Sequence, residues 1–540
     1  MKLLIPAIAA TLLSCVSCIK TDYRVGGRLI PVDQTYNIFS EETAIPEVRM
    51  MMADSLSGFS NSRITIGAVR DGRYGLSTRS SALTLIPMFS EADFGENPQV
   101  MNFHFAAAMD TVSVSDPAQW NVLQNVNVYE LSRPIDASKD FDCNASVPHG
   151  SARITRGRPV VNGKDSLSFD FSREYAERYL SIKDSDLKDM DTYLAKFPGI
   201  YIDTDKPLGK GGRFNMFKLQ LGFDKSNYYI SGNCAALTIR TKYPEWDRRK
   251  DTTFFFFYGA TDMFDIDSLL TNGTAGSLPE YSLNMSTHET REMEGEATDR
   301  VFIEGGGGLK PVITARTLKD AADAIIASKG ASPENVVINK ATIVLPFEFP
   351  DDYREMERFP EMLSPTCKIK VNGVTSFMGL TDASSSDENQ GDIDRSNLNF
   401  APDITYHMQE LMKMDDKKIE SGQYDIWFLI MANETVTTTN SSSNDMSEYY
   451  QLLAYQNYYN SMYGGYGYGG YGGYGGGYGN YYQNYYSYMM MAAYANSNQS
   501  STSISQQLDK DRFYLGQVNG PAAERHPVLE LTFSVPKSEN

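Results

Sequence analysis

The chain has few cysteines for its length. Only five occur in 540 residues. Cys143, Cys234 and Cys367 lie far apart, and an odd, widely spaced set is not the framework of a disulfide-stapled secreted domain. We predict three buried free thiols, although one bridge between two of them is an alternative. Cys-x-x-Cys spacing, which metal sites use, occurs only at Cys15 and Cys18.

Signatures of catalysis and of nucleotide binding are also absent. The sequence contains no Gly-x-Ser-x-Gly elbow, no His-Glu-x-x-His zinc motif and no phosphate-binding loop. The glycine run 305–308 is followed by Pro311 and predicts a tight turn. The acidic stretch 387–394 has leucine at position 398, where a calcium loop needs glutamate, and favours a flexible loop. His104 and His407 are predicted to be structural, and no cofactor or metal is expected.

Positive charge is scarce. The chain has 49 Lys and Arg against 68 Asp and Glu, a formal net charge of −19. The excess is spread along the chain, so no basic stripe offsets repulsion from a polyanion. This composition argues against nucleic acid as a partner.

The amino terminus carries an apolar run, 3–13, that is too short to cross a bilayer of ~30 Å. Small residues precede cysteine twice, at Cys15 and at Cys18, which is the pattern of a lipoprotein signal peptide. Cys15 fits better because a leucine stands three positions upstream, whereas Cys18 gives a more usual signal length. We therefore predict a signal peptide at 1–17, or 1–14 if Cys15 is acylated. Acyl chains such as palmitate would then hold the protein on membrane lipid.

Most of the remaining chain alternates apolar and polar residues between turn-forming Gly, Asp, Asn and Pro, which is typical of half-buried strands. The clearest runs span 63–69, 82–86, 126–131, 217–221, 236–243, 253–258, 301–304, 336–349, 424–431 and 528–535. Helical spacing is confined to 318–328, 403–414 and a pattern over 173–196 that is interrupted near 185. The expected fold is mostly β, with tandem, jelly-roll-like β-sandwich domains and a few short helices.

The domain organisation is predicted from changes in composition. An anchor-proximal linker with a first turn or helix occupies 18–60, one sandwich spans 61–245 and a second spans 250–540. The boundary is placed in the polar loop 244–252, and a position near 295 is the alternative.

A segment rich in glycine and tyrosine, 437–505, interrupts the second domain. Seventeen of the 34 tyrosines lie within 449–494, a composition that cannot offset its ordering entropy with a core. We expect a disordered insertion between two strands, and a tolerated loop expansion without a ligand is the favoured interpretation. The alternative is an element that stacks on sugars or aromatic groups. Its candidate ligand-binding residues are Tyr463, Tyr466, Tyr468, Tyr471 and Tyr474.

An ordered set of short motifs resembles a known family. The motifs are Gly26–Pro31, Gly67–Gly75, Val128–Leu131, Phe197–Ile202, Gly306–Lys310 and Ile338–Pro346. Together they are similar to the lipoprotein family of domain of unknown function 4270 across nearly the whole chain. The resemblance implies an outer-membrane lipoprotein and carries over no catalytic residues.

The expected function is therefore non-catalytic binding by a lipid-anchored protein of the outer membrane, facing the cell surface or the periplasm. Capture of a glycan or another polymer is the first hypothesis. An accessory subunit of an outer-membrane assembly or export complex, with an envelope protein as partner, is the alternative. A hydrolase that uses two close carboxylates is the least favoured.

Overall fold

The computed structural model describes residues 36–60, 63–89, 91–110, 123–136, 141–163, 166–218, 221–224, 229–259, 282–371, 374–385, 388–438 and 501–537. The fold is mostly β, with 49% strand and 15% helix. Its curled antiparallel sheets form a β-sandwich-like architecture, so the predicted fold class is confirmed.

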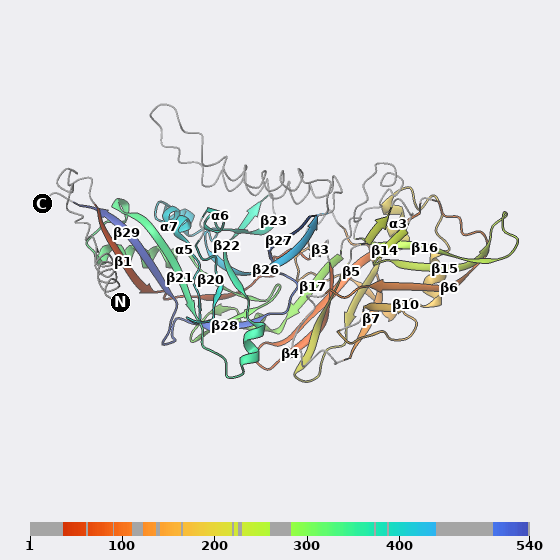
Figure 1. Ribbon diagram of the computed structural model, residues 1–540, viewed down its shortest axis with the longest axis horizontal. Helices are drawn as coiled ribbons and strands as arrows, with labels where there is room; N and C mark the ends of the chain where they lie inside the picture. Colours follow the sequence, from red (N-terminus) through yellow and green to blue (C-terminus); the bar gives the residue numbers. More distant parts are fainter. Residues whose placement is uncertain are drawn as a thin grey trace, which may run out of the picture.

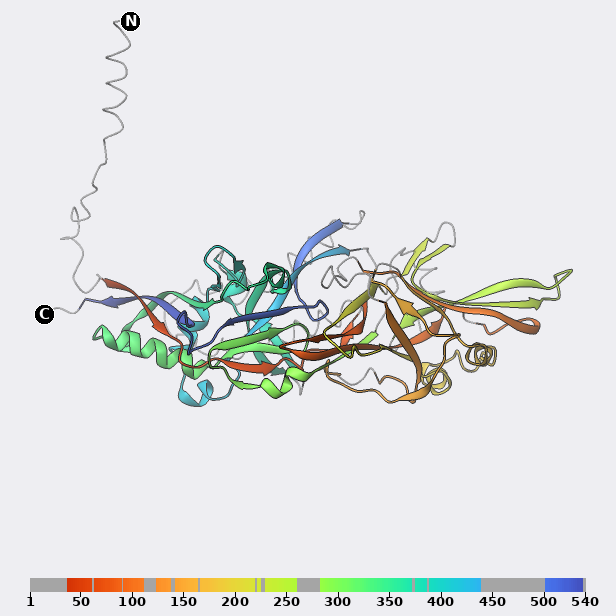
Figure 2. The same cartoon turned by 90° about the horizontal axis from the view of Figure 1, so that it is seen from below.

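The molecule is elongated and consists of two bodies that lie one after the other along its long axis (Figures 1 and 2). Each body has its own hydrophobic core. The core of the first body is built from residues between 64 and 258. The core of the second body combines residues 45–52 with residues between 297 and 533. The described chain begins at β1 and ends after β29 at one end of the molecule, while the tips of β6, β15 and β16 lie at the other (Figure 1).

The first body is a large, branched antiparallel sheet. Its main path is β10 (Leu167–Asp170), β6 (Glu96–Ala107), β15 (Ala235–Lys242), β16 (Lys250–Gly259), β5 (Gly75–Pro87), β11 (Ile200–Thr204), β7 (Gln124–Leu131) and β8 (His149–Arg153). The branches are β4 (Arg63–Asp71) with β12 (Gly211–Lys218), β17 (Ser282–His288) with β3 (Phe59–Ser60), and β9 (Val160–Val161). β13 (Leu221–Asp224) and β14 (Tyr229–Gly232) form a separate pair. The run predicted as one strand at 217–221 is thus divided between β12 and β13.

The second body contains several smaller sheets. One has the order β1 (Tyr36–Ala44), β29 (Val528–Pro536), β21 (Val337–Pro346), β25 (Asn399–Phe400) and β24 (Ile393–Asp394). Another has the order β18 (Gly295–Glu296), β2 (Arg49–Met52), β20 (Leu309–Ile313), β26 (Ile426–Thr438), β22 (Met362–Val371) and β23 (Val374–Gly379), with β27 (Ser501–Leu508) beside β26. β19 (Arg300–Glu304) pairs with β28 (Leu515–Asn519).

Helices are short in the described part of the chain. They are α2 (Arg173–Tyr179), α3 (Met190–Lys196), α5 (Ala315–Ser328), α6 (Asp382–Ser385), α7 (Thr405–Leu411) and α8 (Asp416–Ile419), with 3-10 turns η3 (Glu289–Met293), η4 (Pro333–Asn335) and η5 (Tyr353–Arg358). The pattern over 173–196 is interrupted as predicted. The longest helix, α5, begins three residues earlier than predicted, because the Thr314 side chain accepts the Thr317 backbone N–H and caps it.

Strand pairing does not follow the boundary at 244–252. That loop joins β15 and β16, which pair with each other, and β17 then pairs with β5. The first body therefore extends to His288, close to the alternative position near 295. The segment 18–60 also differs from the linker and turn expected there, because β1 and β2 in its described part pair with β29 and β20 of the second body. The pairings of β1 with β29 and of β2 with β20 cannot be recognised in the local sequence, because the partner strands are far away along the chain.

The flanks of the glycine- and tyrosine-rich segment are strands. β26 and β27 pair antiparallel with Thr438 opposite Ser501. Residues 437–438 and 501–505 thus belong to a hairpin, and the part of the predicted insertion between them lies outside the described residues. Cys143 and Cys367 are buried free thiols as predicted, whereas Cys234 is only half-buried. Among the described residues, no helix is long and apolar enough to cross a membrane.

His407 of α7 makes stability sensitive to pH. The side chain is buried, its Nε2 lies 3.1 Å from the Tyr424 carbonyl oxygen, and burial lowers its pKa to about 4. Below its ordinary pKa of about 6.5 the unfolded chain takes up a proton that the folded chain refuses. Stability is therefore lost as the pH falls from 6.5 towards 4, by about 3 kcal/mol when complete.

The test is urea unfolding at several pH values for the wild type and His407→Leu. The variant should show a smaller loss of stability between pH 6.5 and 4 than the wild type. Asp382, which accepts the His407 backbone N–H, acts in the opposite direction because burial raises its pKa to about 6. Because the wild type and His407→Leu both keep Asp382, the difference between their pH slopes isolates the contribution of His407. Equal slopes in His407→Leu and the wild type would contradict the assignment.

Candidate functional site

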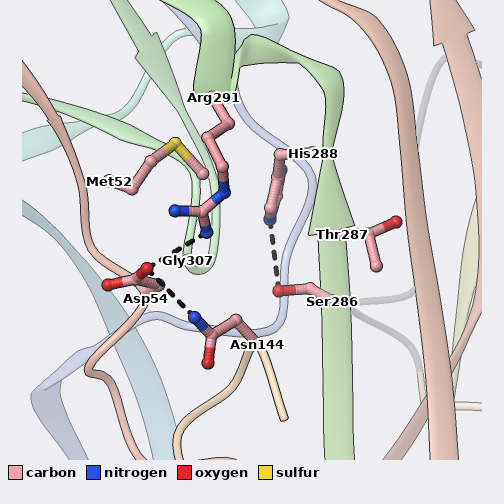
Figure 3. A pocket seen from close by; sticks show the side chains of 8 residues that line it. All are labelled: Met52, Asp54, Asn144, Ser286, Thr287, His288, Arg291 and Gly307. Atoms are coloured by element: carbon pink, nitrogen blue, oxygen red, sulfur yellow. Dashed lines mark hydrogen bonds and ion pairs between the residues drawn. The ribbon is translucent and has the colours of Figure 1, made fainter. Parts of the chain in front are cut away.

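A polar cavity of about 200 Å³ lies where the two bodies meet (Figure 3). β17 of the first body supplies one wall, and the end of β2 and the turn between β19 and β20 supply the other. The lining residues are Met52, Asp54, Asn144, Ser286, Thr287, His288, Arg291 and Gly307. Chain segments from distant parts of the sequence therefore build this cavity together.

Ser286 and His288 stand two residues apart on β17. Alternate residues of a strand point to the same face, so both side chains are directed to one side of the sheet. Ser286 Oγ lies 3.2 Å from His288 Nε2, and this contact is drawn in Figure 3. Both side chains are buried apart from their contact with the cavity.

Glu304, the last residue of β19, lies on the other side of the His288 ring. Its Oε1 is 2.8 Å from His288 Nδ1, and both side chains are only 3% exposed. The contact is short, but its direction does not suit a linear hydrogen bond. The carboxylate also accepts hydrogen bonds from Ser77 Oγ and, at 2.5 Å, from Thr290 Oγ1.

The surroundings determine the charge of both groups. Burial alone would favour the neutral acid of Glu304, but His288 and the two hydroxyl donors outweigh it and hold the pKa at about 2. Burial lowers the pKa of His288; Glu304 opposes this shift, while Arg79 and Lys310 add to it. We therefore assign an ionised carboxylate beside a neutral imidazole near pH 7.

The glycine run 305–308 forms the predicted turn, and Lys310 is folded beneath it. The Lys310 ammonium donates to the carbonyl oxygens of Glu304, Gly306 and Gly308, the last two at 2.9 Å. Because the amine is occupied by main-chain carbonyls, this loop is not arranged to hold phosphate. Burial lowers the pKa of Lys310 to about 7, while Glu304 opposes the shift.

Gly306 lies directly against the Arg79 guanidinium. A Cβ at this position would come within 2.0 Å of an Arg79 nitrogen, and the backbone has φ +60°. Glycine is therefore required both by the close approach and by the left-handed conformation. The contact brings Arg79 of the first body onto the turn of the second.

The mouth of the cavity is polar. Asp54 Oδ2 accepts hydrogen bonds from Arg291 Nη2 and from Asn144 Nδ2, each at 3.0 Å (Figure 3). Arg291 is half exposed, so part of its guanidinium faces solvent. The arginine and the asparagine place hydrogen-bond donors beside Ser286 and His288.

His104 forms a second serine, histidine and acid arrangement on the surface of the first body. Its Nδ1 lies 2.7 Å from Asp170 Oδ1, and its Nε2 lies 3.1 Å from Ser168 Oγ. The register explains the contacts, since His104 on β6 is directly opposite Asp170 on β10. The His104 side chain is 40% exposed, and none of the three residues lines the cavity.

Three aromatic rings stack on the outer face of β7, β8 and β11. The His149 ring lies between Tyr201, at 4.1 Å and 9° between planes, and Tyr129, at 5.0 Å and 24°. Asn127 and Asp203 form the next register pair on the same face, joined by a hydrogen bond of 3.0 Å. The surface thus combines ring faces with amide and carboxylate groups.

The structure does not describe the candidate site residues named from the sequence. Cys15, Cys18 and the five tyrosines Tyr463, Tyr466, Tyr468, Tyr471 and Tyr474 fall outside the described residues. In the part of the chain that is described, no three His, Cys, Asp or Glu side chains gather as metal ligands. In the acidic loop, Asn389 and Asp394 accept backbone N–H groups of their own turns. The cavity holds one carboxylate, Asp54, and not the close pair that the hydrolase hypothesis requires.

No pattern in the sequence predicts that Ser286, His288 and Glu304 lie together. A Ser-x-His pair on a strand is common, and the acid follows on a strand of a different sheet. Comparisons with protein-family models, with curated proteins and with solved structures find no match to this chain. The family resemblance therefore rests on the short motifs alone.

Proposed function

We propose that this chain is a lipid-anchored outer-membrane lipoprotein that binds a polysaccharide. The paired small-residue and cysteine motifs at the amino terminus support the lipid anchor. The elongated body supports a role in display, because β1 begins at one end of the long axis and the first body extends to the other (Figure 1).

The observation that carries the proposal is the stacked surface of Tyr129, His149 and Tyr201. The C–H faces of sugar rings pack against aromatic faces, and the neighbouring hydroxyls need planar polar partners. Asp203 supplies a carboxylate of this kind on the same face, and the buried Asn127 holds it through a hydrogen bond of 3.0 Å. Arg153 Nε, 3.2 Å from Asn127 Oδ1, extends the polar row onto β8.

The test is retention of the mature chain in affinity electrophoresis against cell-wall and dietary polysaccharides. Tyr129→Ala should weaken retention about tenfold, equivalent to about 1.4 kcal/mol. Tyr406→Ala is the matched control, because this tyrosine is 44% exposed on the second body. A second variant, in which a short Gly/Ser linker replaces 439–500, measures how much the tyrosine-rich segment contributes to retention.

Two results would overturn the proposal. The first is that no polysaccharide of the panel retains the wild type. The second is retention that is unaffected by Tyr129→Ala, by Tyr201→Ala and by removal of 439–500.

A further inference from the structure

We propose that Ser286, His288 and Glu304 form a nucleophilic site that hydrolyses small acyl esters. This activity is separate from polysaccharide binding, since the site lies at the junction of the two bodies and the stacked rings lie on the outer face of the first. The three groups stand in the order that nucleophilic catalysis requires: a hydroxyl, a base within reach of it, and an acid on the far side of the base.

The distances support each role. Ser286 Oγ is 3.2 Å from His288 Nε2, which suits transfer of the hydroxyl proton. His288 Nδ1 is 2.8 Å from Glu304 Oε1, so a positive charge formed on the ring lies against a carboxylate. The bent direction of this second contact matches resting enzymes, whose catalytic contacts align only when substrate is bound.

The charges agree with the same roles. A base must be neutral to accept the serine proton, and burial together with Arg79 and Lys310 favours the neutral ring. The acid must be ionised to stabilise the imidazolium, and the pKa of Glu304 is low although burial opposes ionisation. Glu304 touches the histidine and not the cavity, so it is a positioning residue.

The cavity indicates the size of the substrate. Its volume of about 200 Å³ is below the ~300–1,000 Å³ of ordinary ligand pockets. It therefore suits an acyl group of a few carbons, such as an acetyl ester, with the alcohol directed to solvent. Arg291 and Asn144 line the same cavity. We assign the N–H groups that they do not use for Asp54 as donors to a negatively charged carbonyl oxygen.

The reaction balances with water as the only co-reactant. Ser286 Oγ bonds to the ester carbonyl carbon while its proton moves to His288 Nε2. The bond from that carbon to the alcohol oxygen breaks, and the proton passes from Nε2 to the departing alkoxide. Water then gives a proton to Nε2 and bonds to the acyl carbon, the Oγ–carbon bond breaks, and the proton returns to Oγ as the carboxylic acid leaves.

The exposed group of Ser168, His104 and Asp170 provides an internal control. It has similar distances, but its residues do not line the cavity and the His104 side chain is 40% exposed to solvent. A reaction that needs the enclosed site should therefore depend on Ser286 and not on Ser168.

The experiment treats the folded mature chain with a fluorophosphonate probe and maps the modified residue by mass spectrometry. Hydrolysis of p-nitrophenyl acetate is followed in parallel. We expect the label on Ser286, loss of the label in Ser286→Ala and its retention in Ser168→Ala. Ester hydrolysis should fall at least 100-fold in Ser286→Ala, while retention on polysaccharide stays at the wild-type level.

The proposal is overturned if the wild-type chain takes no label at Ser286, or if Ser286→Ala hydrolyses the ester at the wild-type rate. Thermal unfolding of the variant verifies its fold. If Ser286→Ala fails to fold, mapping of the label on the wild type alone decides the question. Failure of the labelling and of ester hydrolysis would not affect the polysaccharide-binding proposal, because retention is measured separately.

Discussion

Replacement of Glu304 by leucine is expected to lower the free energy of unfolding by about 3–5 kcal/mol, the usual effect of removing one partner of a buried charged group. The carboxylate is 3% exposed and lies beside His288, with Ser77 and Thr290 as hydroxyl donors. Without it, the buried cations Lys310 and Arg79 lose the negative charge that stabilises them.

The matched control is Glu410→Leu, which removes a carboxylate paired at 3.3 Å with Lys413 on the surface of α7. An exposed pair of this kind contributes at most about 1 kcal/mol. Urea unfolding of the wild type and the two variants measures the difference. A Glu304→Leu chain within 1 kcal/mol of the wild type would show that the cations at the junction do not depend on this carboxylate.

The contribution of Glu304 also depends on pH. Its folded pKa of about 2 lies below the ordinary value, so its stabilisation is present above pH ~4.3 and is lost as the pH falls towards 2. Glu304→Leu should therefore flatten the stability profile in this acid window.

Replacement of Phe105 by alanine is expected to lower the free energy of unfolding by about 3–5 kcal/mol. The ring is completely buried in the first body. It stacks on Phe169 at 4.6 Å and 7°, and on Tyr258 at 4.5 Å and 24°. Removing it leaves a cavity between these rings, which the surrounding strands cannot close without moving the sheet.

Met101→Ala is the control, because Met101 lies on the same strand, β6, and is 45% exposed. It should change the free energy of unfolding by no more than about 0.5 kcal/mol. If both variants lose the same stability, the strand and not the ring stack determines the effect. Chemical unfolding followed by far-ultraviolet circular dichroism is a suitable measurement, since it reports on the strands.

Much of the architecture is predictable because strands leave a period-two pattern in the sequence. The run 126–131 alternates in this way and forms β7, and the run 528–535 forms β29. β1 was missed although its inward side chains Phe39 and Glu41 are partly buried. Its partner β29 lies almost 500 residues away, so no local residue identifies the pairing.

The site is less predictable than the fold. From the sequence, His288 could be grouped at most with Ser286, two residues earlier on β17, because its acid is on β19. These strands belong to different sheets that meet only when both bodies have formed. The glycine turn was recognisable from its composition, but the use of Lys310 to bind its carbonyl oxygens depends on burial that composition does not show.

The pairing of β1 with β29 determines when the five-stranded sheet of the second body can be completed during folding. Ser40 on β1 and Thr532 on β29 are hydrogen-bonded at 3.0 Å across a separation of 492 residues. At a synthesis rate of about 5–20 residues per second, roughly 25–100 s pass between the emergence of the two strands. The first body can fold during that interval, whereas β1 must wait with an unpaired edge. A chaperone that protects exposed strands would therefore act on this first segment, and truncation of the last strand would remove the partner that β1 and β21 share.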